Sequence, residues 1–323
     1  MWPFTNLASA TGFSNRRQWE PQTGLPDLDG KVALVTGGNT GIGLITAQEL
    51  HKKNAKVYIA CRSEERAKKA IAQINAAHPG AEKNLVYLPF DLTDLTSAKK
   101  AAETLSEKEE RLDILVCNAG VMAWPYELKN GVEVQFWNHL GHFALVDKLL
   151  PLLKKTAQIA GSSVRVVNVA SLGHTMSPKP DFTSLEGVNQ KMKSTWHRYG
   201  QSKLANILFT AELQERLKGD NIRVNCCHPG NIYTELTRGT VASYGFLGSA
   251  ITFMSRYAMT PFEGAKTQLY LAASPEVDEK DYRGEYFTPI ATLGKASAYG
   301  QDKQLAEQLW KLSEETVNKS EST

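Results

Sequence analysis

The sequence contains no long hydrophobic run. No stretch approaches the ~18 consecutive apolar residues that argue for a membrane-spanning helix, and residues 1–24 lack the apolar core of a signal peptide. The nearest candidate lies between Arg238 and Arg256, where Gly, Ser and Thr interrupt the apolar residues. We therefore expect a cytoplasmic protein without a transmembrane span, although this segment could rest against a membrane or lipid surface.

The sequence also lacks a large excess of either positive or negative charge. The net charge is +3, and the lysine and arginine residues form no long run. A protein that binds nucleic acid is expected to carry a clustered basic stripe, so we expect no nucleic-acid partner.

Cysteine is rare and follows no ligand-like pattern. The four cysteines contain no C-x-x-C pair, and they lie at the ends of apolar runs, at Cys61, Cys117, Cys226 and Cys227. Such cysteines are usually small buried hydrophobic residues, which favours a reducing compartment. His139 and His142 are three residues apart, but no His-Glu-x-x-His motif or third ligand accompanies them. We therefore expect no metal site and interpret both histidines as packing or interface residues.

What the sequence does contain is an alternation of apolar, β-branched runs with helical patterns. The runs are nearly continuously apolar, as expected of strands that are covered on both faces. A βαβα alternation of this kind predicts an α/β fold of the Rossmann type, a doubly wound and mainly parallel sheet of about seven strands with helices on both faces. The first six predicted strands are Lys31–Thr36, Ala55–Cys61, Asn84–Phe90, Leu112–Cys117, Ser163–Val169 and Asn221–Cys227.

The domain organisation follows from the absence of a linker. A length of 323 residues would suggest about two domains, but no segment divides the chain. We expect an N-terminal extension over residues 1–29 and a single domain over residues 30–323. The alternation breaks after Cys227, where the apolar residues 231–262 are expected to form a substrate lid. A last strand is predicted near Gly284–Phe287 and a C-terminal helix from about Lys303.

The first predicted strand leads directly into a glycine-rich turn and a helix. Gly37, Gly41 and Gly43 allow a tight turn and let the backbone approach a pyrophosphate closely. The helix N-terminus then offers free N–H groups and a partial positive charge. The spacing is G-x-x-x-G-x-G rather than G-x-G-x-x-G, and a simple turn would also account for it. Its place at the first strand–helix junction nevertheless predicts a dinucleotide site.

The ends of the next two strands indicate which dinucleotide binds. An acidic residue after the second strand would favour NAD, but this strand ends in Cys61-Arg62. Arg62 can make a bidentate contact with a 2′-phosphate, so the predicted cofactor is NADP(H). Arg62 could also lie simply on the solvated start of the following helix. Asp91, at the end of the third strand, is placed to bind the adenine amino group or to cap a helix.

Two Tyr-x-x-x-Lys pairs occur, Tyr199/Lys203 and Tyr299/Lys303. Residues four apart share one face of a helix, but about one such pair is expected by chance in this composition, so the spacing alone is not evidence. Tyr199 begins a strongly helical stretch between the fifth and sixth strands. Ser171 follows the fifth strand, at the edge where ligands gather in open α/β sheets. The context therefore favours Tyr199/Lys203.

These elements together resemble the short-chain dehydrogenase/reductase superfamily over roughly residues 30 to 290. The elements that carry the resemblance occur in the family's order: the glycine loop at 36–43, Asn118-Ala119-Gly120, Asn138, Ser171, Tyr199-x-x-x-Lys203 and Pro229-Gly230. Within the superfamily the chain looks most like the retinol dehydrogenase and WW-domain oxidoreductase branch. That likeness rests on Ala60-Cys61-Arg62, on the segment Asn138-His139-Leu140-Gly141-His142-Phe143 and on Val167-Asn168-Val169-Ala170-Ser171.

The resemblance implies catalytic roles. Tyr199 would exchange a proton with the substrate oxygen, and Ser171 would hold that oxygen and stabilise its charge. A free phenol has a pKa near 10, so Lys203 is expected to lower the pKa of Tyr199 and also to bind the nicotinamide ribose. Asn138 would position a water that connects Lys203 to solvent.

The resemblance also implies the cofactor contacts. They comprise backbone groups of the glycine loop, residues that follow the later strands, Thr234 at the nicotinamide carboxamide and the catalytic pair itself. The expected cofactor-binding residues are Gly37, Asn39, Thr40, Gly41, Ile42, Gly43, Arg62, Asp91, Leu92, Asn118, Ala119, Gly120, Tyr199, Lys203, Pro229, Gly230 and Thr234.

These observations predict an NADP(H)-dependent dehydrogenase or reductase that acts on an alcohol or carbonyl group. The apolar side chains of the expected lid favour a lipophilic small molecule such as a retinoid, a steroid, an aldehyde or another apolar metabolite, although they could equally pack the lid or a subunit contact. A non-catalytic NADP(H)-binding regulatory protein is the alternative from another class. A nucleotide-sugar epimerase or dehydratase fits less well, because such enzymes usually have a different glycine spacing. The resemblance also implies a homodimer, since relatives often dimerise through the helices that carry Asn138 and Tyr199.

Overall fold

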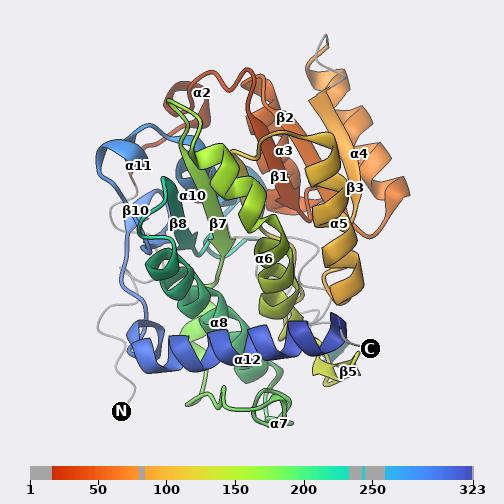
Figure 1. Ribbon diagram of the computed structural model, residues 1–323, viewed down its shortest axis with the longest axis vertical. Helices are drawn as coiled ribbons and strands as arrows, with labels where there is room; N and C mark the ends of the chain where they lie inside the picture. Colours follow the sequence, from red (N-terminus) through yellow and green to blue (C-terminus); the bar gives the residue numbers. More distant parts are fainter. Residues whose placement is uncertain (1–16, 80–83, 233–241, 244–258, 322–323) are drawn as a thin grey trace.

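The computed structural model describes residues 17–79, 84–232, 242–243 and 259–321. In these residues a mainly parallel sheet of eight strands lies between two layers of helices (Figure 1). The strands are β1 (Val32–Thr36), β2 (Lys56–Cys61), β3 (Leu85–Pro89), β4 (Ile114–Cys117), β7 (Val164–Val169), β8 (Ile222–Cys227), β9 (Tyr286–Thr288) and β10 (Thr292–Leu293).

The strand order reverses next to β1. The spatial order is β10-β9-β8-β7-β4-β1-β2-β3, and only β10 runs antiparallel to its neighbour. The chain moves outward from β1 to β3 and then returns to β4 on the other side of β1. Ligands bind at the carboxyl ends of the strands at such a reversal. The doubly wound fold is confirmed, and the sheet has one strand more than expected.

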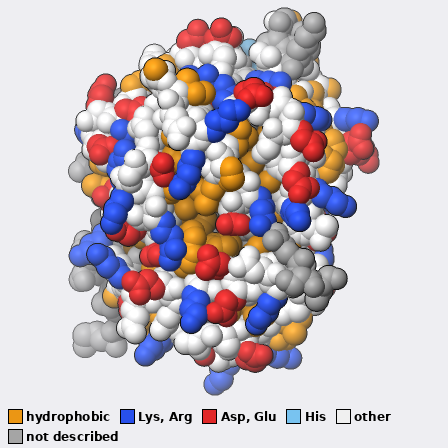
Figure 2. Space-filling model, viewed as in Figure 1, with side chains coloured by type: hydrophobic (Ala, Val, Ile, Leu, Met, Phe, Trp, Pro, Cys, Tyr) orange, Lys and Arg blue, Asp and Glu red, His pale blue; other side chains and the backbone are white. Residues whose placement is uncertain are grey.

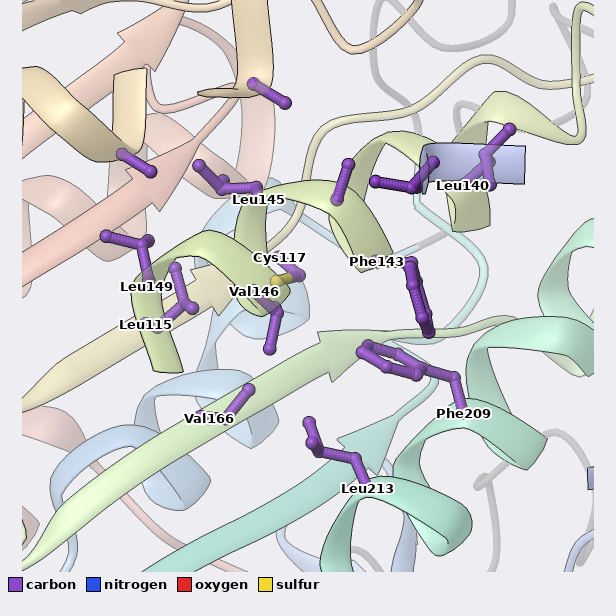
Figure 3. Packing of buried hydrophobic residues seen from close by; sticks show 14 of the residues in the cluster. Leu115, Cys117, Leu140, Phe143, Leu145, Val146, Leu149, Val166, Phe209 and Leu213 are labelled. Carbon is purple, nitrogen blue, oxygen red and sulfur yellow. The ribbon is translucent and has the colours of Figure 1, made fainter. Parts of the chain in front are cut away.

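Helices cover both faces of the sheet, and its central strands β1, β4 and β7 are buried along their whole length. One face packs against α3 (Gly41–Lys52), α4 (Glu64–Ala77) and α10 (Pro261–Ala273). The other packs against α5 (Leu95–Lys108), α6 (Trp137–Ala157) and α8 (Thr195–Arg216). Figure 3 shows this second core, in which Phe143 of α6 meets Phe209 of α8 above the strands β4 and β7.

The C-terminal helix α12 (Lys303–Glu321) begins where the sequence predicts it and forms an outer layer. It runs across α8 and α6 (Figure 1). Trp310 lies against Phe143 and Phe209 with ring centres 5.0 and 6.0 Å apart, and the guanidinium of Arg216 lies 4.2 Å from the Trp310 ring centre. A homodimer formed through α6 and α8 would therefore have to use surface that α12 leaves open.

Residues 17–28 pack against the body of the chain. Trp19, Leu25 and Leu28 are buried in the core beneath α10, and the Trp19 ring lies edge-on to Tyr270. Arg17 forms an ion pair with Glu276. This segment lies before the expected start of the domain at residue 30, yet it shares its core. The smaller elements are α2 (Pro21–Gly24), β5 (Leu128–Lys129), β6 (Val132–Glu133), η2 (Leu172–Met176), α7 (Leu185–Val188), α11 (Glu276–Glu279) and η5 (Tyr299–Gln301).

The surface agrees with the charge pattern of the sequence. On the face shown in Figure 2, positive and negative side chains are interspersed around a central apolar strip. No helix among the described residues is long and apolar enough to cross a membrane. The Arg238–Arg256 segment lies outside the described residues apart from residues 242–243.

Candidate active site

The glycine loop joins β1 to α3 as the sequence predicts. Gly37 and Gly41 have φ angles of +66° and +57°, a conformation that glycine adopts without strain. A Cβ atom on Gly43 would lie 2.4 Å from the carbonyl oxygen of Gly37, so α3 can pack onto the turn only if residue 43 is glycine. Thr40 is the N-cap of α3 but makes no side-chain cap hydrogen bond. The first N–H groups of α3 therefore have no cap from this side chain.

Thr36, the last residue of β1, connects this loop to the end of β4. Its hydroxyl oxygen accepts hydrogen bonds from the backbone N–H groups of Asn118 and Ala119, at 2.8 and 2.9 Å. The Asn118 side-chain amide donates to the Thr36 carbonyl, 2.8 Å away. The Thr36 hydroxyl also contacts Nε2 of His142, 2.8 Å away, while His142 Nδ1 bonds the Asn138 carbonyl. The expected cofactor turn is thus fixed to both β1 and α6.

The residues expected at the adenosine end lie on neighbouring strand ends. Arg62 is exposed after β2, and its positive charge acts on Asp91 after β3. Lys129 Nζ lies 3.6 Å from Oδ2 of Asp91. Burial tends to raise the pKa of Asp91, but hydrogen bonds from Thr93 and these two cations hold it below its usual value. Asp91 is not the cap of α5, because Asp94 fills that position.

The backbone of Leu92, the residue after Asp91, packs closely against α6. A Cβ atom on Gly141 would lie 2.0 Å from the Leu92 carbonyl oxygen, so the strand end after β3 rests directly on α6. The close approach requires glycine at position 141, one of the residues of the segment that carries the family resemblance.

Asn138 lies in the first turn of α6 and is fully buried. Its amide donates to the Val121 carbonyl (2.9 Å) and to the Ser202 hydroxyl (3.0 Å), while its oxygen accepts from the Val121 N–H (2.8 Å). A Cβ atom on Gly120 would lie 3.0 Å from Oδ1 of Asn138 and 3.7 Å from Nζ of Lys203. The structure therefore brings Asn138, Gly120 and Lys203 together. Val121 and Ser202 use both amide hydrogens of Asn138, and its backbone carbonyl already contacts Nδ1 of His142 (2.9 Å), so the expected water contact stays a prediction.

Ser171 and Tyr199 meet across a glycine. The hydroxyl of Ser171 accepts the Gly173 N–H at 3.0 Å, and its interaction with the Tyr199 phenol lowers the pKa of that phenol. A Cβ atom on Gly173 would lie 2.9 Å from Cε1 of Tyr199 and 3.2 Å from the Ser171 oxygen. Glycine at position 173 is thus what lets the phenol ring approach the serine.

The electrostatics of the Tyr199/Lys203 pair differ from the expectation. Burial raises the pKa of Tyr199 to about 12, and the bond with Ser171 opposes this only in part. Burial also lowers the pKa of Lys203 to about 8. Lys203 Nζ donates to the Val169 carbonyl (2.9 Å) and lies 5.9 Å from the centre of the Tyr199 ring. Burial of the phenol, opposed only by Ser171, sets the direction of this pKa shift, and the expected lowering of the Tyr199 pKa by Lys203 is not seen in this structure.

The second Tyr–Lys pair lies in a different environment. Tyr299 begins η5 and is 36% exposed, whereas Tyr199 is 4% exposed. Lys303 is exposed and Lys203 is buried. The pair favoured from the sequence, Tyr199/Lys203, is thus buried beside Ser171, whereas Tyr299/Lys303 lies at the surface.

Pro229 and Gly230 follow β8 at the same edge of the sheet. Gly230 has a φ of +96°, and its N–H donates to Nδ1 of His228 at 3.0 Å. Ile232 and Met259 form a parallel bridge, so these two residues lie side by side at this edge although 27 positions separate them in the sequence. Thr234 and most of the expected lid, residues 231–262, lie outside the described residues.

Sequence reasoning missed several residues that hold the site. His174 donates from Nδ1 to the Ser171 carbonyl (2.7 Å) and accepts the Ser297 N–H at Nε2 (3.0 Å). No spacing pattern marks His174, Thr36 or Gly173 in the sequence. His139 and His142 do not face a common centre: Nε2 of His139 contacts the Ser313 hydroxyl on α12. Among the described residues no group of three His, Cys, Asp or Glu side chains could hold a metal ion.

Comparison with known proteins connects this geometry to a family. A family model described as short chain dehydrogenase matches residues 31–244. An uncharacterized oxidoreductase of Schizosaccharomyces pombe is 42% identical over 277 residues, which cover 84% of this chain and 80% of that protein. Retinol dehydrogenase 12 of Mus musculus is 38% identical over 288 residues, covering 88% of this chain and 86% of its own length.

Solved structures show the same likeness. A protein from Mycobacterium paratuberculosis has a TM-score of 0.69 at 29% identity, covering 93% of this chain and 97% of that one. The RhlG/NADP active-site complex of Pseudomonas aeruginosa has a TM-score of 0.61 at 26% identity, covering 87% of this chain and 98% of the other.

Proposed function

The chain belongs to the short-chain dehydrogenase family, and we propose that it is an NADP(H)-dependent dehydrogenase/reductase acting on an alcohol or carbonyl group. The observation that carries the proposal is the convergence of Asn138, Ser171, Tyr199 and Lys203 at the carboxyl ends of the strands. A protein that only binds a nucleotide needs no proton-transfer group beside the nucleotide site.

The residues at the glycine loop fit a dinucleotide. Gly37 and Gly41 have positive φ angles, and the N-terminus of α3 can bind the pyrophosphate. Arg62, on the exposed end of β2, would bind a 2′-phosphate. Asp91 would accept a hydrogen bond from the adenine amino group. The similar RhlG structure is a complex with NADP, which supports this choice of cofactor.

Tyr199 is the proposed proton donor for carbonyl reduction. Bound NADPH supplies the hydride. With a pKa of about 12 the Tyr199 phenol is protonated at neutral pH but is a weak acid, so the transfer of its proton to the substrate oxygen depends on a positive charge that stabilises the phenolate as it forms. The Ser171 hydroxyl already accepts the Gly173 N–H, so its own proton can be donated to the same oxygen. Lys203 then stabilises the phenolate that remains.

Asn138 connects the segment after the cofactor turn to the helix that carries Lys203. Its side chain fixes Val121 next to Gly120 and bonds Ser202, the residue before Lys203. In this reading Asn138 keeps the cofactor turn and the Lys203 segment in register. A water positioned by Asn138 would complete the proton path from Lys203 to solvent.

A lipophilic substrate fits the described surroundings. Leu172 and Met176, on the helical turn η2 directly after Ser171, are 36% and 41% exposed. Exposed apolar side chains beside a catalytic serine favour an apolar compound. The similarity to retinol dehydrogenases supports the same class.

The deciding experiment is an NADPH-oxidation screen over a library of carbonyl compounds, run in parallel with NADH. We expect turnover with NADPH, stronger for apolar carbonyls than for small polar ketones. Tyr199→Phe should abolish turnover and leave NADPH binding nearly intact, whereas Tyr299→Phe, the matched control, should change neither. Binding of NADPH with no turnover on any compound would favour the regulatory alternative.

A further inference from the structure

We propose that the buried ion pair between Glu133 and Arg198 is a positioning pair that holds the first turns of α6 and α8 together and fixes residues 121–126 as a wall of the substrate site. Neither residue belongs to the set that performs the chemistry. The inference rests on the proposed function, because residues 121–126 follow the cofactor turn 118–120 directly.

Arg198 connects three segments at once. It lies in the first turn of α8, immediately before Tyr199, and its side chain is 3% exposed. Its Nε donates to Oε1 of Glu133 at 3.0 Å, its Nη2 to the Trp124 carbonyl at 3.0 Å and its Nη1 to the Met192 carbonyl at 3.3 Å. The guanidinium also lies 5.5 Å from the ring centre of Tyr126. A planar group with several fixed donors can make these contacts together, which an ammonium cannot.

Glu133 carries the connection to α6. Its side chain is 2% exposed, and Oε2 accepts the backbone N–H groups of Gln135 and Phe136, at 3.0 and 3.2 Å. These groups precede the first residue of α6, Trp137. The carboxylate therefore holds the start of α6, whose first turn carries Asn138, and its negative charge favours that helix end.

Neighbouring polar groups join the same two helix starts. Gln135 Nε2 donates to the Thr195 carbonyl in the first turn of α8, 3.0 Å away. The Glu133 N–H donates to Oδ1 of Asn189, and the Tyr126 hydroxyl donates to the Asn189 carbonyl, at 2.8 and 2.9 Å. The ion pair is thus the centre of a hydrogen-bond network that connects the N-terminus of α6 to the N-terminus of α8.

Residues 121–126 are held at successive points by this network and by the catalytic residues. Asn138 bonds both backbone groups of Val121, the Ser243 hydroxyl donates to the Ala123 carbonyl (2.6 Å), and Arg198 holds the Trp124 carbonyl. The same stretch therefore touches a catalytic residue at one end and Arg198 at the other. A shift of Arg198 moves the wall of the site without removing any reacting group.

Burial makes the pair sensitive to a single change. Removing one charge leaves the other enclosed without its partner, and a lysine at position 198 cannot reach all three oxygen acceptors. The chain offers a matched control in Arg165 of β7. It is also 3% exposed and ion-paired, with Asp278, but its partners lie at the opposite, amino-terminal end of the strands.

The test compares Arg198→Lys with Arg165→Lys in the full chain. For Arg198→Lys we expect the KM for the best carbonyl substrate to rise about 10-fold or more, which corresponds to the loss of one charge-assisted hydrogen bond that holds the wall. The KM for NADPH should stay within about twofold, because Thr36 holds the cofactor turn independently of Arg198. Amide hydrogen exchange of residues 121–126 should be about 10-fold faster or more. Arg165→Lys should change neither quantity. Equal behaviour of the two variants, or unchanged exchange in Arg198→Lys, would overturn the proposal.

A second variant and a measurement that does not depend on turnover complete the test. Should Arg198→Lys not fold, Glu133→Gln, which keeps the side-chain volume and one acceptor oxygen, is measured in the same way with the same expectation. Should the wild type turn over no carbonyl compound, the proposed function fails, but the exchange comparison still decides the positioning role by itself.

Discussion

The side-chain amine of Lys203 donates a hydrogen bond to the backbone carbonyl of Val169, 2.9 Å away, at the last residue of β7. Ser171 lies two residues beyond this carbonyl, so one hydrogen bond connects the lysine of the catalytic pair to the strand that presents the serine. Burial lowers the pKa of Lys203 to about 8, which brings its titration close to physiological pH.

This pKa predicts the pH dependence of carbonyl reduction. Below pH 8 Lys203 is charged and Tyr199, with its pKa of about 12, is protonated, so both are in the form that reduction needs. Above pH 8 Lys203 loses its charge and no longer stabilises the phenolate. We therefore expect kcat for reduction to be flat below about pH 8 and to fall above it, as measured by NADPH oxidation between pH 6 and 10. In Lys203→Arg the fall should disappear from this range, since arginine stays charged. A wild-type rate that rises through pH 8 would contradict the assignment.

Gly173→Ala should impair catalysis without affecting cofactor binding. The new Cβ atom would lie 2.9 Å from Cε1 of Tyr199, so the ring must move away from Ser171. A displacement of this size can cost on the order of 100-fold in kcat. NADPH affinity, measured by fluorescence, should stay within about twofold. Gly219→Ala is the control, because nothing lies within 4 Å of its Cβ position. Full activity in Gly173→Ala would show that the close approach is not needed.

Arg62→Ala should reduce the preference for NADPH over NADH. A charge-assisted contact to phosphate contributes about 1.5–3 kcal/mol, which corresponds to roughly 10- to 100-fold in affinity. Dissociation constants for both cofactors measure the effect, and only that for NADPH should rise. Lys69→Ala removes a positive charge from α4, the helix that follows Arg62, where Lys69 pairs with Glu65, and serves as the control. A wild-type preference for NADH would overturn the argument from Arg62.

Trp310→Ala should destabilise the fold while leaving the site intact. The indole is 8% exposed and packs on Phe143 and Phe209. Replacing a buried tryptophan by alanine typically costs about 3–5 kcal/mol. The free energy of unfolding by urea should fall by that order, with kcat unchanged in conditions where the variant is folded. Lys311→Ala, on the exposed side of α12, should lose less than about 0.5 kcal/mol.

Much of the fold could be predicted because its strands are buried on both faces. Val32–Thr36 and Val164–Val169 are buried along their whole length, and their boundaries differ from the prediction by one residue. β10 was missed because two exposed residues, Thr292 and Leu293, carry no periodic signal. Its pairing with β9 depends on the turn between them.

The site was only partly predictable. The order of the motifs indicated which tyrosine to choose, and the structure brings Tyr199 beside Ser171. The sequence could not predict whether the pKa of Tyr199 is raised or lowered, because the direction of the shift depends on how completely the ring is desolvated. Asp91 was open to two interpretations, and the structure places Asp94 at the cap of α5. Thr36 and His174 connect segments more than 80 and 120 residues apart in the chain, and a single sequence gives no signal for such contacts.

The parallel bridge between Ile232 and Met259 has an evolutionary consequence. Since the residues on either side of segment 233–258 are already joined, that segment can change length or sequence without shifting β8 or α10. Doubling the length of a loop with fixed ends costs only about 0.6 kcal/mol of closure entropy. If segment 233–258 forms the lid that the sequence predicts, its replacement would change the substrate range, while the strand before Ser171 and the helix that holds Tyr199 stay as they are.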